Sequence, residues 1–329
     1  MKAAVYRRYG PPEVIRIEEV AKPVPRAGEV LIAVRAAAVN PLDAHLMKGR
    51  PILARLALGL FGPKRTRPGV DLAGTVETVG AGVTRFRPGD AVFASCRGGA
   101  LAEFVCAPET KLAFKPDNIS FAQAAATPVA GVTALQGLRD KARMEAGWTV
   151  LVNGAAGGVG TFAVQIAKAL GGHVTGVCSA RNLEMVRAIG ADRTVDYTQE
   201  DFTRGDARYD LIFDLVSNHP FSALRRVLAP GGMVLAAGGP GFDGLGAGRW
   251  AARQVGGLLA SRFASARMAL LAARIHGEDL SVLAGMMEVG TVTPVVERSY
   301  SLYETAAAIR EVAQGHARGK VVVAVGDER

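Results

Sequence analysis

The chain has 329 residues, of which 49% are hydrophobic and 21% charged, and its formal net charge is +9. No apolar run reaches the ~18 residues that a membrane-spanning helix needs. The Lys and Arg residues are scattered, without a basic tail or interleaved aromatics, which argues against nucleic-acid binding. The length is typical of a two-domain globular protein.

The first 120 residues are predicted to be rich in β-structure. Short apolar segments separated by Pro-Gly turns indicate strands at residues 2–6, 14–18, 29–39, 74–79, 91–94 and 102–105. From about residue 120 the pattern changes to one long helical stretch, residues 121–140, followed by strands and helices in alternation.

This alternation predicts a parallel, doubly wound α/β sheet. The expected strands are residues 148–153, 173–178, 193–196, 209–215 and 233–237, and the expected helices are residues 160–170, 182–189 and 221–228. A sixth strand is predicted at residues 268–275. The tail then adds helices at 279–289 and 302–314 and a last strand at 320–325.

The glycine cluster between the first of these strands and its helix is typical of a dinucleotide-binding turn. In the segment WTVLVNGAAGGVGTFAVQIAKAL, Gly158, Gly160 and Ala163 fit the pattern G-x-G-x-x-G/A. The first glycine allows a tight turn, the second allows the backbone to approach the phosphates, and the small third residue lets the helix pack on the strand. The anion would lie at the helix N-terminus, which favours negative charge.

The end of the next strand bears on the choice of cofactor. An NAD-specific protein would carry an Asp or Glu there, about 20 residues past the glycines, to bind the ribose 2′-hydroxyl. This chain has Ser179, followed by Arg181. A hydroxyl and a guanidinium suit a 2′-phosphate, so we expect NADPH. In the alternative interpretation, Ser179 caps a helix that begins near Asn182 and Arg181 is a solvated charge.

Several longer segments resemble the zinc-independent quinone oxidoreductase branch of the medium-chain dehydrogenase/reductase superfamily. These segments are GEVLIAVRAAAVNPLD, PGVDLAGTVETVGAGVTRFRPGDAVFA, VNGAAGGVGTFAVQIAKALG, CSARNLEMVRAIGADRTVDY and GHARGKVVV, and they follow the family's order over nearly the whole chain. The resemblance implies an α/β protein with a GroES-like, β-rich catalytic domain of residues 1–120, completed by residues 273–329. A Rossmann domain of residues 121–272 would bind NADP, with the active site in the cleft.

The same resemblance implies that the chain binds no metal. Where zinc-dependent members carry a cysteine this chain has Asn40, and where they carry His-Glu it has Val70-Asp71. Valine cannot ligate a metal ion. The chain has three cysteines in total, too few for a four-cysteine structural zinc site.

The resemblance also assigns the cofactor-binding residues. The pyrophosphate would contact Gly157, Gly158, Val159 and Gly160, and the 2′-phosphate would contact Ser179 and Arg181. Tyr197 would lie at the adenosine end, Leu215 and Val216 near the adenine or ribose, and Gly238 and Gly239 near the nicotinamide ribose. His316 and Arg318 would reach the cofactor from the terminal loop. Turn formation and packing equally explain Tyr197 and the glycine pair, and a solvated loop equally explains His316 and Arg318.

Asn40 is the best polar candidate for a catalytic residue beside the nicotinamide or the substrate oxygen, with Asp43 behind it. Asn40 could equally be a turn residue before Pro41. His45 is a candidate proton donor, although a lone histidine is more often a packed or surface residue.

The expected function is therefore the NADPH-dependent reduction of quinones or α,β-unsaturated carbonyls. Hydride attack on a conjugated acceptor delocalises charge onto oxygen, so the protein has mainly to hold donor and acceptor together in a dry site. Two alternatives are the reduction of another double bond, such as that of an enoyl thioester, and an NADPH-binding sensor without turnover.

Three further expectations concern the surroundings of the protein. Apolar residues 51–63, flanked by basic residues, would form a hydrophobic gate for the substrate. Residues 249–274 would form an amphipathic helix broken at Gly256-Gly257, either packed on the core or in weak contact with a membrane surface. The resemblance suggests a homodimer joined through strand 268–275. The lack of a signal-peptide pattern, together with three cysteines that cannot all pair, suggests the cytoplasm.

Overall fold

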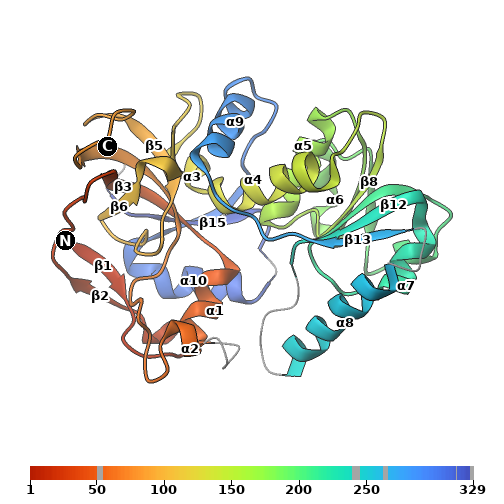
Figure 1. Cartoon of the computed structure of the whole chain (residues 1–329), viewed down its shortest axis with the longest axis horizontal. Helices are drawn as coiled ribbons and strands as arrows, with labels where there is room; N and C mark the ends of the chain where they lie inside the picture. The colour runs from red at the N-terminus through yellow and green to blue at the C-terminus, as the bar shows by residue number, and fades with distance from the viewer. Residues whose placement is uncertain (50–54, 239–244, 262–265, 316, 327–329) are drawn as a thin grey trace. The chain divides into compact units, whose positions relative to one another are not determined.

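The computed structural model describes all residues except 50–54, 239–244, 262–265, 316 and 327–329 (Figure 1). The chain forms two compact units. Unit 1 combines Met1–Val132 with Ile275–Arg329, and unit 2 is Thr133–Arg274. The divisions between the units therefore fall at Val132 and Arg274, and the helix that begins at Phe121 lies in unit 1. Within the described residues, no helix is both long and apolar enough to cross a membrane.

Unit 1 is built on a mainly antiparallel sheet, in which one pair of described strands is parallel, and a small additional hairpin. Its strands are β1 (Lys2–Val5), β2 (Arg16–Glu19), β3 (Glu29–Val39), β4 (Asp71–Val79), β5 (Ala91–Ser95), β6 (Phe104–Pro108), β7 (Leu112–Phe114), β14 (Val296–Ser301) and β15 (Lys320–Ala324). In the described chain the main sheet has the order β14-β15-β3-β4-β5-β7, and β6 also pairs with β3. β1 and β2 form the separate antiparallel pair.

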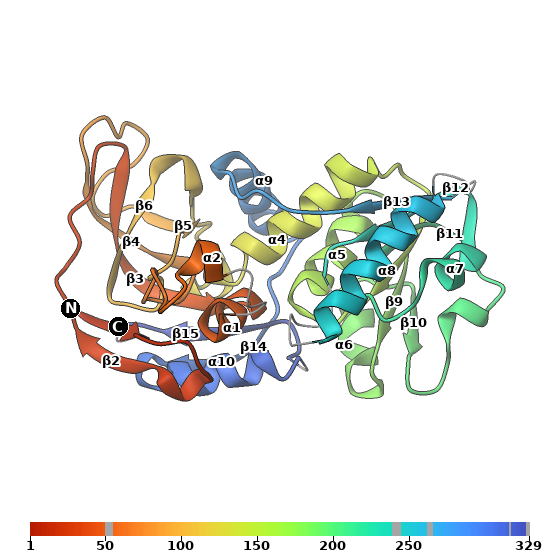
Figure 2. The ribbon, with the colours of Figure 1, turned by 60° about the horizontal axis from the view of Figure 1, so that its bottom comes forward.

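The helices of unit 1 surround this sheet. They are α1 (Pro41–Lys48), α2 (Arg55–Leu58), α3 (Phe121–Ala125), the start of α4 (Pro128–Leu135), α9 (Gly277–Glu288) and α10 (Thr305–Ala313), with short 3₁₀ turns η1 (Pro12–Val14), η3 (Glu109–Lys111) and η8 (Leu302–Glu304). Figure 2 shows α10 beside β14 and β15. The C-terminal part of the chain thus completes the N-terminal sheet.

The register of three strands brings distant residues together at one end of this sheet. Val321 of β15 pairs with Val39 of β3, and Ala38 of β3 pairs with Asp71 of β4. The register therefore places Lys320, Asn40 and Asp71 side by side. Long apolar strands fix this register, because a one-residue slip would turn the buried side chains of β3 to the other face.

Unit 2 contains a sheet with the strand order β10-β9-β8-β11-β12-β13, and every pair in its described part is parallel. The strands are β8 (Thr149–Asn153), β9 (His173–Cys178), β10 (Arg193–Asp196), β11 (Tyr209–Asp214), β12 (Leu228–Ala236) and β13 (Arg267–Leu270). From β8 the chain adds strands toward one edge of the sheet, and from β11 it adds strands toward the other edge. The crossover helices of the two halves therefore cover opposite faces of the sheet. The predicted doubly wound sheet is confirmed.

Helices cover both faces of the parallel sheet (Figure 1). They are α5 (Gly158–Ala169), α6 (Leu183–Ala188), α7 (Phe221–Leu224) and α8 (Leu245–Ser261), with the π-helical η4 (Gln136–Ala142) and the short turns η5 (Ala180–Asn182), η6 (Phe202–Arg204) and η7 (Arg225–Val227). α5 packs with η4 on one face, and α7 with α8 on the other. Phe221 and Leu224 of α7 belong to the same buried core as Ile212 of β11.

Several predicted elements need correction. The helix expected at 121–140 is divided into α3, α4 and η4, because Pro128 begins a new helix and cannot continue the preceding one. Helix α8 is not broken at Gly256-Gly257. A Cβ on Gly257 would lie 2.5 Å from the Met268 Sδ, so this glycine permits close packing of α8 on β13. The sixth strand ends at Leu270 and not at residue 275.

Candidate functional site

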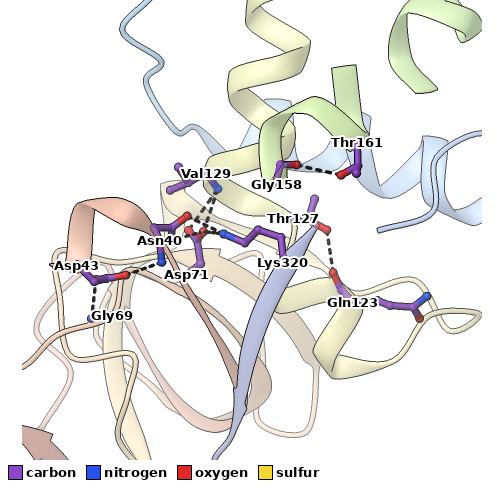
Figure 3. A network of polar contacts seen from close by, with 10 residues as sticks. All are labelled: Asn40, Asp43, Gly69, Asp71, Gln123, Thr127, Val129, Gly158, Thr161 and Lys320. Atoms are coloured by element: carbon purple, nitrogen blue, oxygen red, sulfur yellow. Dashed lines mark hydrogen bonds and ion pairs between the residues drawn. The ribbon is translucent and has the colours of Figure 1, made fainter. Parts of the chain in front are cut away.

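A buried polar network lies at the end of the unit 1 sheet where β3, β4 and β15 meet (Figure 3). The Lys320 Nζ donates to the Asn40 Oδ1 at 2.6 Å, and the Asn40 Nδ2 donates to the Asp71 Oδ2 at 2.9 Å. The Lys320 Nζ is also 3.7 Å from the Asp71 Oδ2. All three residues are less than 5% exposed. Since an ammonium only donates and a carboxylate only accepts, the orientation of the Asn40 carboxamide is fixed.

Asn40 also begins helix α1, and Asp43 secures this helix start. The backbone N–H of Asn40 donates to the Asp43 Oδ2 at 2.8 Å, and the backbone N–H of Gly69 donates to the Asp43 Oδ1 at 2.9 Å. Pro41 occupies the first helical turn, where no N–H is required. The turn expected at Asn40-Pro41 is thus a helix N-terminus, which leaves the Asn40 side chain free to bind Asp71 and Lys320.

Burial shifts the pKa values of the charged groups in this network. Desolvation raises the pKa of Asp43 to about 6, against the two backbone hydrogen bonds that favour its ionised form. Desolvation also raises the pKa of Asp71 and lowers that of Lys320, and the attraction between the two opposes both changes. The backbone N–H of Val129, at the start of α4, adds hydrogen bonds to both carboxylate oxygens of Asp71 at 3.3 and 3.2 Å.

The network is a poor zinc site. The resemblance described above places Asn40 and Asp71 at positions where zinc-dependent proteins carry ligands, but here these two side chains are bonded to each other and Asn40 is bonded to an ammonium group. A buried Lys beside the same oxygens would repel a divalent cation. Among the described residues, no group of three His, Cys, Asp or Glu side chains is placed to hold a metal ion. The residues present do not fit a zinc ion.

A second candidate site lies at the carboxyl edge of the parallel sheet in unit 2. Because all its strands run in one direction, the residues that follow β8, β9, β10, β11 and β12 share this edge. Five positions predicted to bind the cofactor follow a strand there: Ser179, Tyr197, Leu215, Val216 and Gly238. The turn after β8 leads into α5, whose N-cap is Gly157.

The glycines of this turn are required by close backbone contacts. Gly154 has φ +90°, a conformation that glycine adopts without strain. A Cβ on Gly160 would lie 2.1 Å from the Gly154 carbonyl oxygen, whereas one on Gly157 would lie 3.5 Å from the same oxygen. The close approach at Gly160 is therefore to the protein's own backbone. The compact turn leaves the first amide groups of α5 without helical partners, directed outward from the helix start.

Ser179 and Arg181 occupy the end of β9. The Ser179 Oγ accepts a hydrogen bond from the Asn182 Nδ2 at 3.2 Å, and Ser179 begins the turn η5 without a side-chain capping bond. Ser179 thus stands at the N-cap position of this turn, but its hydroxyl does not cap the turn. Arg181 is exposed, as is 54% of Tyr197.

A polar network below the same edge was not predicted from the sequence. The Asp214 Oδ1, at the end of β11, accepts hydrogen bonds from the Asn153 Nδ2 and the backbone N–H of Ser217, both at 2.9 Å. The Ser217 hydroxyl donates to the Gly238 carbonyl at 3.0 Å. An acid that ends the apolar strand YDLIFD was the available signal. These bonds connect the ends of β8, β11 and β12.

The remaining predicted positions carry less information. Arg318 is exposed in unit 1, and its backbone N–H donates to the Glu297 Oε2 at 2.6 Å. His45 lies half-buried on α1. Gly239 and His316 lie outside the described residues, as does part of the expected gate at 51–63.

Comparison with known proteins agrees with this architecture. Residues 26–117 match the alcohol dehydrogenase GroES-like domain, and residues 189–323 match a domain described as a zinc-binding dehydrogenase. The chain is 32% identical to the chloroplast envelope quinone oxidoreductase homolog of Arabidopsis thaliana, covering 98% of each chain. It is 35% identical to the NADPH-dependent alkenal/one oxidoreductase of the same plant, covering 98% of this chain and 79% of that protein.

A solved structure is also similar over the whole length. The quinone oxidoreductase from Coxiella burnetii superposes with a TM-score of 0.85 at 29% identity, covering 99% of both chains. The arrangement of a GroES-like unit and a parallel-sheet unit is therefore that of a known fold.

Proposed function

The chain belongs to the quinone oxidoreductase family of the medium-chain dehydrogenase/reductase superfamily, and we propose that it uses NADPH to reduce quinones or α,β-unsaturated carbonyls without a metal ion. The observation that carries the metal-free proposal is the Lys320-Asn40-Asp71 network. In it, Asn40 and Asp71, which the resemblance places at positions of zinc ligands, are bonded to each other and Asn40 is bonded to Lys320. The 35% identical relative named as an NADPH-dependent alkenal/one oxidoreductase supports the choice of cofactor and acceptor.

The glycine turn and the end of β9 fit the cofactor. The backbone amides of Gly158, Val159 and Gly160 would bind the pyrophosphate, and Ser179 and Arg181 the 2′-phosphate. Bound NADPH would supply a hydride to an electron-poor double bond or carbonyl. Tyr197, Leu215, Val216, Gly238, Gly239, His316 and Arg318 stay predicted cofactor contacts.

Asn40 is the proposed catalytic residue. Its Nδ2 has a second hydrogen beyond the one donated to Asp71. We assign that hydrogen to the carboxamide of the nicotinamide or to the oxygen of the acceptor, where it would stabilise developing negative charge. Asp43 holds the start of α1 and so acts as a positioning residue.

The proposal is tested by mixing the purified protein with NADPH and a panel of acceptors: a benzoquinone, an alkenal, an enoyl-CoA ester and a simple ketone. Loss of NADPH absorbance with the quinone or the alkenal, in protein that elemental analysis shows to lack zinc, is the expected result. Turnover of the enoyl ester alone would favour the alternative of thioester reduction. NADPH binding without any turnover would favour the sensor, and stoichiometric zinc would contradict the metal-free proposal.

Three further proposals concern the setting of the enzyme. Unit 1 would supply the catalytic residues and unit 2 the cofactor site. A homodimer would form through β13, which is an edge strand of its sheet. The cytoplasmic location stays a prediction, since some relatives are named as chloroplast proteins. The weak membrane contact of residues 249–274 also stays a prediction.

A further inference from the structure

A short turn in unit 1 exposes large apolar side chains. Phe61 is 101% exposed, Leu56 is 70% exposed and Leu60 is 55% exposed. Single exposed leucines are ordinary, but a phenylalanine fully in water beside two of them is the kind of patch that marks an interaction site. We call residues 59–62 with Leu56 the apolar turn.

The structure holds this turn in place. The Tyr9 hydroxyl donates to the Gly59 carbonyl at 2.8 Å, and the backbone N–H of Gly59 donates to the Arg55 carbonyl at 2.8 Å. The Arg55 guanidinium lies 4.5 Å from the centre of the Tyr9 ring. Because Gly59 has φ +122° and a Cβ there would meet the Gly62 carbonyl, the chain reverses tightly and leaves Leu60 and Phe61 outside.

Basic residues line a cavity directly after this turn. Lys64, Arg65, Arg67 and Arg97, with Thr66 and Gly98, surround a space of about 270 Å³, which we call the basic pocket. None of these four cationic side chains forms an ion pair within the part of the chain that the structure describes. Four uncompensated positive charges around a hollow favour an anionic group there.

Backbone contacts fix the segments that carry these charges. The Arg65 Nη1 donates to the Arg97 carbonyl at 2.9 Å, which ties the two sides of the pocket together. The backbone N–H of Tyr6 donates to the Thr66 carbonyl at 2.8 Å, and that of Gly99 to the Pro68 carbonyl at 3.1 Å. The basic pocket is thus a built feature with a defined place next to the apolar turn.

We propose that the apolar turn and the basic pocket together dock the protein on membranes that contain anionic phospholipids. A soluble phosphate compound would explain the cations and not the exposed Phe61. A lipid surface explains both, because guanidinium groups pair with headgroup phosphates while apolar side chains enter the acyl boundary. This inference deepens the proposed function, since lipid-soluble quinones are concentrated in membranes, but its test does not require turnover.

The test is co-sedimentation of the full chain with phosphatidylcholine vesicles, with and without phosphatidylserine. We expect binding to the anionic vesicles only, and release by added salt as the charges are screened. Phe61→Ser should weaken binding at least fivefold. Arg65→Gln with Arg67→Gln should weaken it more than tenfold, since each cation near an anionic surface contributes about fivefold.

Matched variants on other surfaces serve as controls. Val255→Ser removes an apolar side chain that is 56% exposed on α8. Arg85→Gln with Arg87→Gln removes the same charge from another loop of unit 1. Both controls should bind vesicles within twofold of the unchanged protein. All variants should keep their circular dichroism spectrum and their melting temperature, which shows that any loss of binding is not a loss of folding.

Each other outcome rejects the inference. It is wrong if the unchanged protein stays in the supernatant with anionic vesicles, or if Phe61→Ser binds as well as the unchanged protein. Loss of binding in Val255→Ser alone would assign the contact to α8. Calorimetric binding of inorganic diphosphate that depends on Arg65 and Arg67, without vesicle binding, would assign the pocket to a soluble ligand. Vesicle binding by a protein without reductase activity would reject the proposed function and leave the docking surface intact.

Discussion

Asn40 is held between two groups of opposite charge, and this arrangement predicts what its removal does. Asn40→Ala leaves the buried Asp71 and Lys320 without their shared partner, which costs stability because buried polar groups need hydrogen bonds. If Asn40 also contacts the reacting groups, kcat per folded enzyme should fall at least tenfold while the dissociation constant of NADPH changes by less than about threefold.

The comparison needs a variant that disturbs the same helix without touching the Asn40 side chain. Asp43→Asn serves, because Asp43 accepts hydrogen bonds from backbone groups only in the described contacts. Its kcat should stay closer to that of the unchanged enzyme. A purely structural role for Asn40 would instead lower the melting temperature and leave kcat per folded enzyme unchanged.

Asp43 itself predicts a dependence of stability on pH. Its pKa rises from 3.8 to about 6 on folding, so between these values the folded protein binds more protons than the unfolded chain. The free energy of unfolding should therefore fall as the pH rises from about 4 to about 6, by up to ~3 kcal/mol from this residue. Urea unfolding across this range should show the fall, and Asp43→Asn should show a flatter profile. An equal slope in both proteins would contradict the shifted pKa.

Arg181 tests the choice of cofactor. If its guanidinium binds the 2′-phosphate, Arg181→Ala should weaken NADPH binding about tenfold to a hundredfold, the value of one or two charge-assisted hydrogen bonds. NADH, which lacks that phosphate, should lose less than threefold. Fluorescence titration with both nucleotides gives the two constants, and Arg187→Ala, an exposed arginine on α6, is the matched control. Equal losses for the two nucleotides would remove the basis for NADPH preference.

At the scale of elements, the glycine turn gives a sharp contrast between two neighbouring positions. A Cβ on Gly160 would meet backbone atoms of Gly154 and Ala155 at 2.1 and 2.8 Å, and backbone cannot move aside cheaply. Gly160→Ala should destabilise the protein by at least about 2 kcal/mol. Gly157→Ala meets only an ordinary contact at 3.5 Å, so its cost should stay below about 1 kcal/mol, the value of a weaker helix cap. Denaturant unfolding of both variants measures the difference.

The elements that the sequence predicts well are those whose pattern depends on local burial. Strand β3 and strand β9 have the expected bounds because their apolar runs are bordered by turn residues. Helix α1 was missed because Asn-Pro resembles a turn, although an Asn, a Pro and an acid three residues after the Asn are also typical of a helix start. Strand β14, VERSYS, was missed because an exposed edge strand carries polar residues on both faces.

The candidate site divides in the same way. The glycine turn is local, so its spacing in the sequence predicts it. The partners of Asn40 are not local: Asp71 is 31 residues away and Lys320 is 280 residues away. Only the pairing of β15 with β3 brings this lysine to Asn40, and no pattern around Lys320 indicates a buried charge. Asp214 likewise acquires its role from the meeting of three strand ends.

At the scale of the whole molecule, β13 predicts how two copies would associate. This strand pairs with β12 on one side and forms the edge of the described sheet on the other. The N–H of Leu271 donates to the Ala236 carbonyl, so by alternation the N–H of Leu270 points away from β12 toward the open edge. Pairing of two such edges would continue the sheet through a dimer and protect an edge that otherwise invites aggregation.

Light scattering after size-exclusion chromatography should therefore give the mass of two chains. Leu270→Pro removes the outward N–H and should shift the protein to a monomer, because proline cannot donate to a neighbouring strand. Leu270→Ser changes the side chain but keeps the N–H, and it should stay dimeric if backbone pairing joins the two copies. A monomeric unchanged protein contradicts the dimer. A dimer that survives Leu270→Pro places the interface elsewhere on the chain.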